Sequence, residues 1–373
     1  MSALLAERHA AIAPPSTFHD AQRAQRPAQL ALLGTGTVGS AVLARLQRWQ
    51  GTAFGRQLQL VHVANSRRVV GDKRGVALRV PAASVGVAAS LEAVAGAFRS
   101  HGARIVVDAT ASDEVAARHA DWLAQGIHVV TACKLGQGTS LARWRAIRTA
   151  CVRGGARYGD SATVGAGLPL LRSLRELQAG GDRIHAIAGV LSGSLAWLFD
   201  HYDGLRPFSG FVREAREAGY TEPDPREDLS GEDVRRKLLI LARTAGVELE
   251  ADAVEVESLA SPSLAALAKE DVDAALPVLD APLRERFADA YKRGEKLRFI
   301  ARLEDGSAKV GLESLPVDHP LCGGAGTDNK VAIWSDRYRR QPLLIQGPGA
   351  GAAVTAAALL DDVLTIQRDA VGK

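Results

Sequence analysis

The chain has 373 residues, of which 47% are hydrophobic and 24% charged, a composition typical of a globular protein long enough for two domains. Its net charge is +4 at pH 7, but the 46 basic residues are scattered among 42 acidic ones, so we expect no nucleic-acid partner. No apolar run reaches the length of a membrane span, so we expect no membrane partner.

The first 27 residues are rich in alanine, proline, arginine and glutamine, and we interpret residues 1–27 as a flexible leader. They lack the basic and apolar regions of a signal peptide. The three cysteines, Cys133, Cys151 and Cys322, form no Cys-x-x-Cys pair, which favours a reducing compartment. The expected location is therefore the cytoplasm.

A glycine-rich turn follows the first apolar run. Residues 29–33 are typical of a buried parallel strand, and Val38, Val42 and Leu46 then recur at helical spacing. In Gly-x-Gly-x-x-Gly the first glycine permits a tight turn, the second lets a pyrophosphate approach the backbone, and the third lets the helix pack on the strand. The pattern predicts a dinucleotide site, and a glycine-rich turn without a ligand is the alternative. The residues expected at the cofactor are Gly34, Gly36, Thr37, Val38 and Gly39.

The next predicted strand, residues 58–64, ends without an acidic residue. A protein that prefers NAD usually has Asp or Glu there to bind the ribose 2′-hydroxyl. Here Ser66, Arg67 and Arg68 follow, and an arginine can bind a 2′-phosphate through two hydrogen bonds. We therefore predict NADP as the preferred cofactor, with NAD possible, while merely solvated arginines are the alternative.

Two more strands with polar ends are predicted at residues 105–110 and 128–131, with a helix over residues 113–125 between them. This β-α-β order favours a doubly wound α/β sheet, in which ligands bind at the carboxyl ends of the strands. Thr110 and Lys134 lie at such ends and are expected to face the cofactor. A lysine at this place can also be a solvated loop residue.

The rest of the chain predicts a second domain of mixed helices and strands. Its expected elements are a helix after Pro169, a strand over residues 184–191, a mostly helical segment over residues 254–301 and antiparallel strands over residues 309–340. The glycine-rich loop before Pro169 exposes carbonyls that suit a hard cation.

The expected architecture is a Rossmann-like doubly wound nucleotide-binding domain beside an α+β domain. We assign residues 28–155 to the first domain and residues 156–342 to the second. A last strand, glycine-rich turn and helix, within residues 343–373, are expected to return to the first domain and complete it.

The stretch over residues 219–238 combines a proline-stiffened loop with the start of a helix. Glu222 lies in the loop, and Asp233 and Lys237 lie four positions apart on one helix face. A loop carboxylate beside a helical carboxylate and ammonium has the groups to hold a zwitterionic substrate and to move a proton. The alternative is structural, because Ser230 and Asp233 fit a capping box, and Asp233 and Lys237 fit an ordinary exposed ion pair.

Taken together, these motifs resemble homoserine dehydrogenase, and the resemblance covers nearly all of residues 30–368. Its most specific part is Glu-Pro-Asp-Pro at residues 222–225, followed by Asp-x-x-Gly-x-Asp-x-x-x-Lys at residues 228–237. The resemblance implies interconversion of L-homoserine and L-aspartate 4-semialdehyde by a homodimer whose second domain carries the substrate site and the dimer contacts. The other matching stretches are the glycine turn, residues 129–134, residues 162–169, residues 191–194 and residues 347–355.

The resemblance also implies roles for single residues. Lys237 is similar to the residue that gives and takes the proton at the substrate oxygen, and Asp233 to the one that holds the substrate and positions this lysine. Glu222 would bind the substrate ammonium, with the Gly219 backbone and Asp228 in the same pocket. A lysine beside carboxylates is expected to stay charged, so alcohol oxidation should favour alkaline pH. The residues implied beside the nicotinamide are Thr110, Lys134 and Gly351.

A monovalent cation, usually sodium, is also implied, bound by the backbone carbonyls of Val164, Ala166 and Leu168. The sequence departs from the family pattern at Ser161, where an acidic residue is common, and at Cys133, where asparagine is common. The aspartate kinase and the C-terminal regulatory domain that many relatives carry are not expected, and neither is feedback inhibition by threonine.

Two other functions stay open. One is a different semialdehyde oxidoreductase, of the phosphorylating kind, which needs a cysteine nucleophile with a nearby base. Cys133 and Cys322 lack a convincing partner, although His319 is close to Cys322 in sequence. The other is a non-catalytic dinucleotide-binding dimer that acts as a sensor or scaffold.

Overall fold

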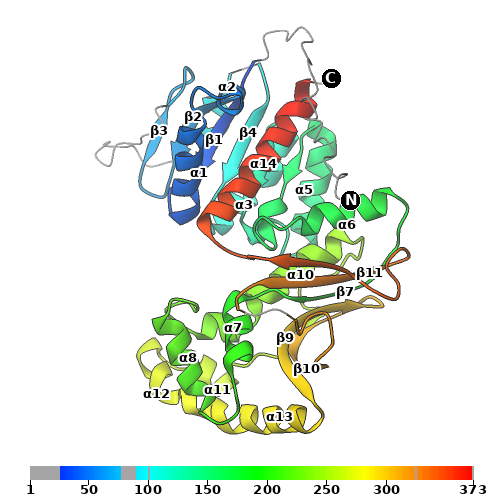
Figure 1. The fold of residues 1–373 in the computed structure, drawn as a ribbon. Coiled ribbons are helices and arrows are strands. Elements are labelled where there is room, and N and C mark those ends of the chain that lie inside the picture. The colour runs from blue at the N-terminus through cyan, green and yellow to red at the C-terminus, as the bar shows by residue number, and fades with distance from the viewer. Residues whose placement is uncertain (1–25, 77–89, 100, 324–325, 372–373) are drawn as a thin grey trace, which may run out of the picture.

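The computed structural model describes residues 26–76, 90–99, 101–323 and 326–371 (Figure 1). Nearly all of the predicted leader, residues 1–25, lies outside the described residues. The described part contains two six-stranded sheets, one in the upper half of Figure 1 and one in the lower half. None of the described helices has the length and hydropathy needed to cross a membrane.

The first sheet has the order β3-β2-β1-β4-β5-β6 and is parallel, except that β3 runs antiparallel to β2. The order reverses direction at β1, as in doubly wound sheets that bind dinucleotides, which confirms the predicted fold class. Its strands are β1 (Ala28–Leu33), β2 (Leu58–Ala64), β3 (Val69–Gly71), β4 (Arg104–Asp108), β5 (His128–Thr131) and β6 (Tyr158–Gly159).

Helices cover both faces of this sheet because successive side chains of a strand point to opposite sides. Leu30 and Leu32 pack with α1 (Thr37–Arg48) and α14 (Ala352–Val371), whereas Ala31 and Leu33 pack on the other face. The predicted helix over residues 113–125 is divided at Arg118 into two shorter helices. The remaining helical elements here are α2 (Ala53–Arg56), α3 (Asp113–Ala117), α4 (His119–Ala124), α5 (Leu141–Gly154), η1 (Leu91–Ala97), η2 (Lys134–Gly136) and η3 (Ser161–Thr163).

The second sheet has the order β12-β11-β7-β9-β10-β8 and is antiparallel, except that β8 runs parallel to β10. The predicted strands over residues 184–191 and 309–340 are confirmed. The helical prediction for residues 254–301 is wrong at both ends, because β8 and β9 pair with β10 there. The strands are β7 (Ile184–Val190), β8 (Val254–Val256), β9 (Glu295–Glu304), β10 (Ser307–Pro316), β11 (Asn329–Ser335) and β12 (Leu343–Gly347).

Helix α10 (Glu232–Thr244) connects the core of the second domain to the first domain. Its Val234, Leu238 and Leu241 are buried in the largest apolar core, together with side chains of α6 (Leu170–Ala179) and β9. Another part of α10 contacts η2 of the first domain. The other helical elements are α7 (Gly193–His201), α8 (Phe208–Glu217), α9 (Arg226–Leu229), α11 (Pro262–Ala265), α12 (Val272–Ala275), α13 (Asp280–Lys292), η4 (Lys269–Asp271) and η5 (Leu276–Leu279).

The chain crosses between the sheets at places that differ from the predicted boundaries. The first sheet continues past residue 155, since β6 pairs with β5. Strand β12, which we expected to return to the first domain, pairs with β11 at the edge of the second sheet. Only the turn after it and α14 return, and there Leu359, Leu360 and Val363 are fully buried beside α1.

Candidate active site

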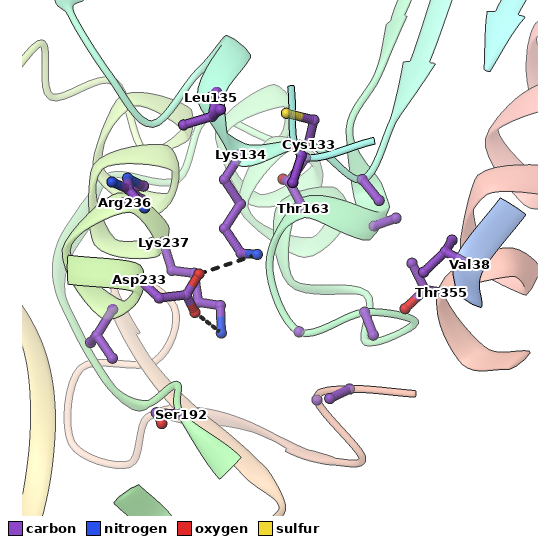
Figure 2. A pocket seen from close by; sticks show the side chains of 18 of the residues that line it. Val38, Cys133, Lys134, Leu135, Thr163, Ser192, Asp233, Arg236, Lys237 and Thr355 are labelled. Atoms are coloured by element: carbon purple, nitrogen blue, oxygen red, sulfur yellow. Dashed lines mark ion pairs between the residues drawn. The ribbon is translucent and has the colours of Figure 1, made fainter. Parts of the chain in front are cut away.

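A cavity of about 880 Å³ lies between the start of α10 and the glycine turn, so both domains line it (Figure 2). It brings together most of the predicted site. The predicted residues that line it are Thr37, Val38, Thr110, Lys134, Ala166, Glu222, Asp228, Asp233, Lys237 and Gly351. The sequence analysis did not single out several other lining residues, most of which lie within the matching stretches: Leu135, Thr163, Glu227, Glu232, Arg236 and Thr355.

The three glycines of the turn occupy the places that their predicted roles require. Gly34 has φ +91°, and a Cβ there would stand 2.8 Å from the Ala109 carbonyl oxygen. A Cβ at Gly39 would stand 1.9 Å from the carbonyl oxygen of Gly34, so only glycine lets α1 pack this close. Nothing lies within 4 Å of a Cβ at Gly36, which leaves room for a ligand. No described side chain caps α1, so its first amides stay available to phosphates.

The turn after β2 is tied to the glycine turn. Asn65 Nδ2 donates to Thr35 Oγ1 at 2.7 Å, and Asn65 Oδ1 accepts from the amides of Arg67 and Arg68, each at 2.9 Å. The side chains of Ser66, Arg67 and Arg68 are exposed and do not line the cavity. The structure therefore puts these three residues beside the predicted dinucleotide site but not in its catalytic end.

A buried carboxylate, Asp108 at the end of β4, organises the nicotinamide end of the predicted site. Its Oδ1 accepts from the amide and the hydroxyl of Thr110, at 2.9 and 2.6 Å. Its Oδ2 accepts from Thr131 Oγ1 at 3.0 Å and lies 3.1 Å from His119 Nε2. Thr131 Oγ1 in turn accepts from the Cys133 amide, directly before Lys134. The sequence analysis did not single out Asp108. The one signal for it is its position as an acidic residue at the end of an apolar strand.

Two lysines share one carboxylate at the centre of the cavity (Figure 2). Asp233 Oδ1 lies 3.2 Å from Lys134 Nζ and Asp233 Oδ2 lies 2.7 Å from Lys237 Nζ. Burial alone would raise the pKa of Asp233, but the two ammonium groups outweigh it and hold the pKa well below its ordinary value. The capping alternative for Asp233 is wrong, because Gly231 occupies the N-cap of α10 and has no side chain to cap it.

Lys237 is the more buried of the two lysines, with 12% of its side chain exposed against 30% for Lys134. Its Nζ also donates to the Leu191 carbonyl at 2.7 Å. Burial lowers the pKa of Lys237, Asp233 opposes this by attraction, and Lys134 adds to the lowering by repulsion. We expected a lysine beside carboxylates to stay charged; Asp233 supplies that attraction, and desolvation in addition makes this lysine easier to deprotonate than an exposed one.

The loop that carries Glu222 is fixed by Asp228. The amide of Glu222 donates to Asp228 Oδ2 at 2.8 Å, and Ser194 Oγ donates to Asp228 Oδ1 at 2.6 Å. Glu222 itself is exposed at the cavity wall. Both Asp228 oxygens thus have partners within the chain, and Asp228 orders the loop while it lines the cavity.

Some predicted site residues do not reach the cavity. Gly219 has φ +75°, is exposed and does not line it. Of the three predicted cation ligands only Ala166 lines it, whereas Val164 and Leu168 do not. Ser161 donates through its hydroxyl to Asp362 Oδ1 at 2.8 Å, so a carboxylate from α14 lies beside the position where the family often has an acidic residue.

Neither candidate thiol has the surroundings of a nucleophile, although Cys133 lines the cavity. Burial and the nearby Asp108 raise the pKa of Cys133 to about 11, and burial also raises the pKa of Cys322. His319 Nδ1 accepts from the Leu321 amide at 3.2 Å, and Cys322 does not line the cavity. A neutral thiol is a poor nucleophile, which disfavours the cysteine-dependent alternative.

Comparisons with known proteins agree with these features. A family model described as the NAD-binding domain of homoserine dehydrogenase matches residues 34–158, and one described as homoserine dehydrogenase matches residues 169–364. A chloroplastic bifunctional aspartokinase/homoserine dehydrogenase of Zea mays is 42% identical over 266 residues, which cover 70% of this chain and 29% of the relative. The chain thus spans less than half the length of the bifunctional relatives that it matches.

Two further matches cover nearly whole chains. A homoserine dehydrogenase of Emericella nidulans is 33% identical over 366 residues, which cover 91% of this chain and 98% of the relative. The solved structure of a putative homoserine dehydrogenase of Archaeoglobus fulgidus is 26% identical with a TM-score of 0.73, covering 91% of this chain and 99% of that one. The chain therefore belongs to the homoserine dehydrogenase family, whose members are NAD(P)-dependent oxidoreductases acting on a CH–OH group.

Proposed function

We propose that the chain interconverts L-homoserine and L-aspartate 4-semialdehyde with NAD(P), a step in the biosynthesis of threonine, methionine and isoleucine. The observation that carries the proposal is the row of Lys134, Asp233 and Lys237 in a cavity that the glycine turn also reaches. The open space at Gly36 and the uncapped start of α1 fit a dinucleotide. When bound, its nicotinamide supplies or accepts the hydride.

Lys237 handles the proton. In its charged form it donates to the carbonyl oxygen of the semialdehyde, and in its neutral form it takes the hydroxyl proton of homoserine. The Leu191 carbonyl and Asp233 direct the Nζ atom, because both lie 2.7 Å from it. Since burial lowers the pKa of Lys237, its neutral form is populated at a lower pH than that of an exposed lysine.

Glu222 supplies the negative charge that the substrate ammonium requires. It lines the cavity on a loop whose amide is bound by Asp228. Asp233 lines the same cavity and holds Lys237 by an ion pair at 2.7 Å. With Glu222 at the substrate ammonium and Lys237 at the reacting oxygen, an amino-acid alcohol or aldehyde is oriented in a single direction.

NADP is the proposed preferred cofactor. The turn after β2 carries no carboxylate for a ribose 2′-hydroxyl, and the Asn65 side chain is already occupied by Thr35 and two backbone amides. The exposure of the Ser66 and Arg67 side chains supports binding of a 2′-phosphate there. The ratio of kcat/KM for NADP and NAD tests this, and a ratio that favours NAD contradicts it.

A monovalent cation is proposed at the carbonyls of Val164, Ala166 and Leu168. The supporting observation is the backbone of this loop, in which Ala166 has φ +50°, an uncommon value for a residue with a side chain. Kinetics in sodium, potassium and tetramethylammonium buffers test it, because a bound ion makes turnover depend on the ion present.

The assembly and location are also proposals. We propose a homodimer formed through the second sheet, in the cytoplasm, with β1 to β6 and α14 as the cofactor domain and the second sheet with its helices as the substrate domain. Light scattering coupled to gel filtration measures the assembly. A monomeric mass at micromolar concentration contradicts the dimer.

The deciding experiment is a spectrophotometric assay of the purified chain with L-homoserine and each oxidised cofactor. We expect reduced cofactor to accumulate. Absence of turnover together with tight dinucleotide binding would favour the alternative of a non-catalytic sensor.

A further inference from the structure

Arg243 holds the segment that follows Lys134 against α10. Only 1% of Arg243 is exposed. Its guanidinium donates to the carbonyl of Gln137, to that of Thr139 at 2.7 Å, and to that of Leu249 at 3.2 and 2.8 Å. A buried arginine on the second domain is thus bonded to two carbonyls of the first.

Backbone carbonyls bind the guanidinium of Arg243 directly, and Glu250 adds an electrostatic attraction. Burial lowers its pKa to about 10, and the guanidinium stays charged at neutral pH. Such a group costs free energy to bury and is most stable while all its carbonyl partners remain in place.

The segment from Lys134 to Thr139 behaves as one compact turn. The Gly138 amide donates to the Lys134 carbonyl at 2.6 Å, and Thr139 Oγ1 donates to the Leu135 carbonyl at 2.8 Å. Its contact with α10 leaves no space, since a Cβ at Gly138 would stand 2.9 Å from the carbonyl oxygens of both Arg236 and Lys134. Holding Gln137 and Thr139 therefore also fixes Lys134.

The contact between the first domain and the α10 region continues beyond Arg243. The Leu141 amide donates to Glu250 Oε2 at 3.0 Å, and Arg145 forms an ion pair with Glu248. These contacts join the start of α5 to the segment after α10. The first domain is therefore attached to α10 at one end by the Lys134–Asp233 ion pair and at the other by buried carbonyl contacts.

We propose that Arg243 is a positioning residue for catalysis: by binding residues 137–139 to α10 it sets the position of Lys134 relative to Asp233 and Lys237. The inference rests on the proposed function, because it assigns a role within the same site. Helix α10 carries Asp233, Lys237 and Arg243, so a displacement at Arg243 reaches the shared carboxylate through a rigid element.

Arg298 provides a control at a second buried arginine. It is 5% exposed, donates to the carbonyls of Phe199 and Leu297 at 2.8 and 2.9 Å, and unlike Arg243 also pairs with Asp200 at 3.2 Å. It lies on β9 and does not line the active-site cavity. Arg298→Lys therefore disturbs a buried guanidinium in the second domain without touching the Lys134 segment.

The test is a double-mutant cycle with Lys134→Met. We expect Arg243→Lys to lower kcat for homoserine oxidation about tenfold in the wild-type background and by less than about twofold when Lys134 is already replaced. Arg298→Lys should have the same small effect in both backgrounds. Wild-type kcat in Arg243→Lys, or an equal loss in both backgrounds, overturns the inference.

Two measurements keep the test decisive. Gly138→Ala pushes the same segment from α10 without changing a charge, and it should reproduce the pattern even if Arg243→Lys folds poorly. Amide hydrogen exchange needs no turnover, so it separates this inference from the proposed function. Exchange over residues 134–139 should accelerate in Arg243→Lys and not in Arg298→Lys, and unchanged protection overturns the inference whether or not homoserine is a substrate.

Discussion

At the scale of single residues, Lys237 shows how burial and charge compete at one atom. Desolvation favours the neutral amine, Asp233 favours the ammonium, and Lys134 favours the neutral amine again. The carbonyl of Leu191 orients the Nζ atom of Lys237 through a hydrogen bond and adds no net charge. Such a group releases its proton more easily than a solvated lysine, so the neutral amine that alcohol oxidation requires forms at a lower pH.

Replacing Lys237 by methionine should abolish most turnover. We expect kcat to fall by about 10²–10⁴, the usual contribution of a positioned acid or base, while the Kd for NADP stays within about twofold. Lys330→Met is the matched control, because Lys330 is also buried, also has its pKa lowered by burial, and does not line the cavity. Turnover retained in Lys237→Met would remove the proposed role.

The pH dependence of homoserine oxidation should respond in opposite senses to the two neighbours of Lys237. The rate requires the neutral amine, so kcat/KM should rise with pH to a midpoint below the ordinary lysine value of 10.5. Asp233→Asn removes an attraction that raises this pKa, and the midpoint should move down. Lys134→Met removes a repulsion that lowers it, and the midpoint should move up. Shifts in the same direction would contradict the assignment.

These residues differ in how far the sequence reveals them. Lys237 and Asp233 are predictable because helical spacing and a specific motif point to the same side chains. Asp108 and Arg243 are not, because their hydrogen-bond partners come from separate elements that only the fold brings together. The lowered pKa of Lys237 is likewise a tertiary effect, since local neighbours alone favour its charged form.

At the scale of elements, two glycines at the junction of β1 and α1 have different roles. Gly39 allows close packing, and Gly36 faces the proposed ligand. Gly39→Ala should destabilise the fold, because its Cβ would overlap the Gly34 carbonyl. Gly36→Ala should fold with a near wild-type Tm, because its Cβ meets nothing within 4 Å, and yet bind NADP at least about tenfold more weakly. Thermal melting and fluorescence titration of both variants check this pair, which fails if Gly36→Ala binds normally.

Element predictions succeeded where local pattern and tertiary context agree. Strand β2 has the predicted bounds, Leu58–Ala64, and the apolar runs of β1, β5 and β7 also read as strands. β8 was missed because its partner β10 lies far along the chain, whereas β9 pairs with β10 directly after it and was missed although this neighbour is local. β12 was assigned to the wrong sheet although its partner β11 precedes it closely in sequence, since the residues of an edge strand carry no signal for the sheet they join.

At the scale of the whole molecule, α14 links the two domains, because it follows the second domain in sequence but packs on the sheet of the first. It leaves the second sheet after β12 and covers one face of the first sheet with Leu359, Leu360, Val363 and Ile366. Burial of each such side chain stabilises by about 1.5–3 kcal/mol. The cofactor domain is therefore incomplete without a helix that follows the entire substrate domain in sequence.

A fragment of residues 26–163 should not fold stably by itself. Without α14 it exposes Leu30, Leu32, Ile105 and Val107, which belong to that covered face. Joining residues 348–371 to its end by a flexible linker should restore cooperative melting and NADP binding. Circular dichroism and fluorescence titration of the two fragments compare them. A cooperative transition of the short fragment at the temperature of the joined one would contradict the role of α14.

This arrangement also has a consequence during synthesis. About 200 residues separate η3 from α14, so at about 5–20 residues per second the ribosome needs roughly 10–40 s to deliver the closing helix. Throughout that time the emerging polypeptide exposes the apolar face of the first sheet that α14 later covers, and chaperones bind such surfaces. The cofactor-binding half, although translated first, is thus the half that matures last.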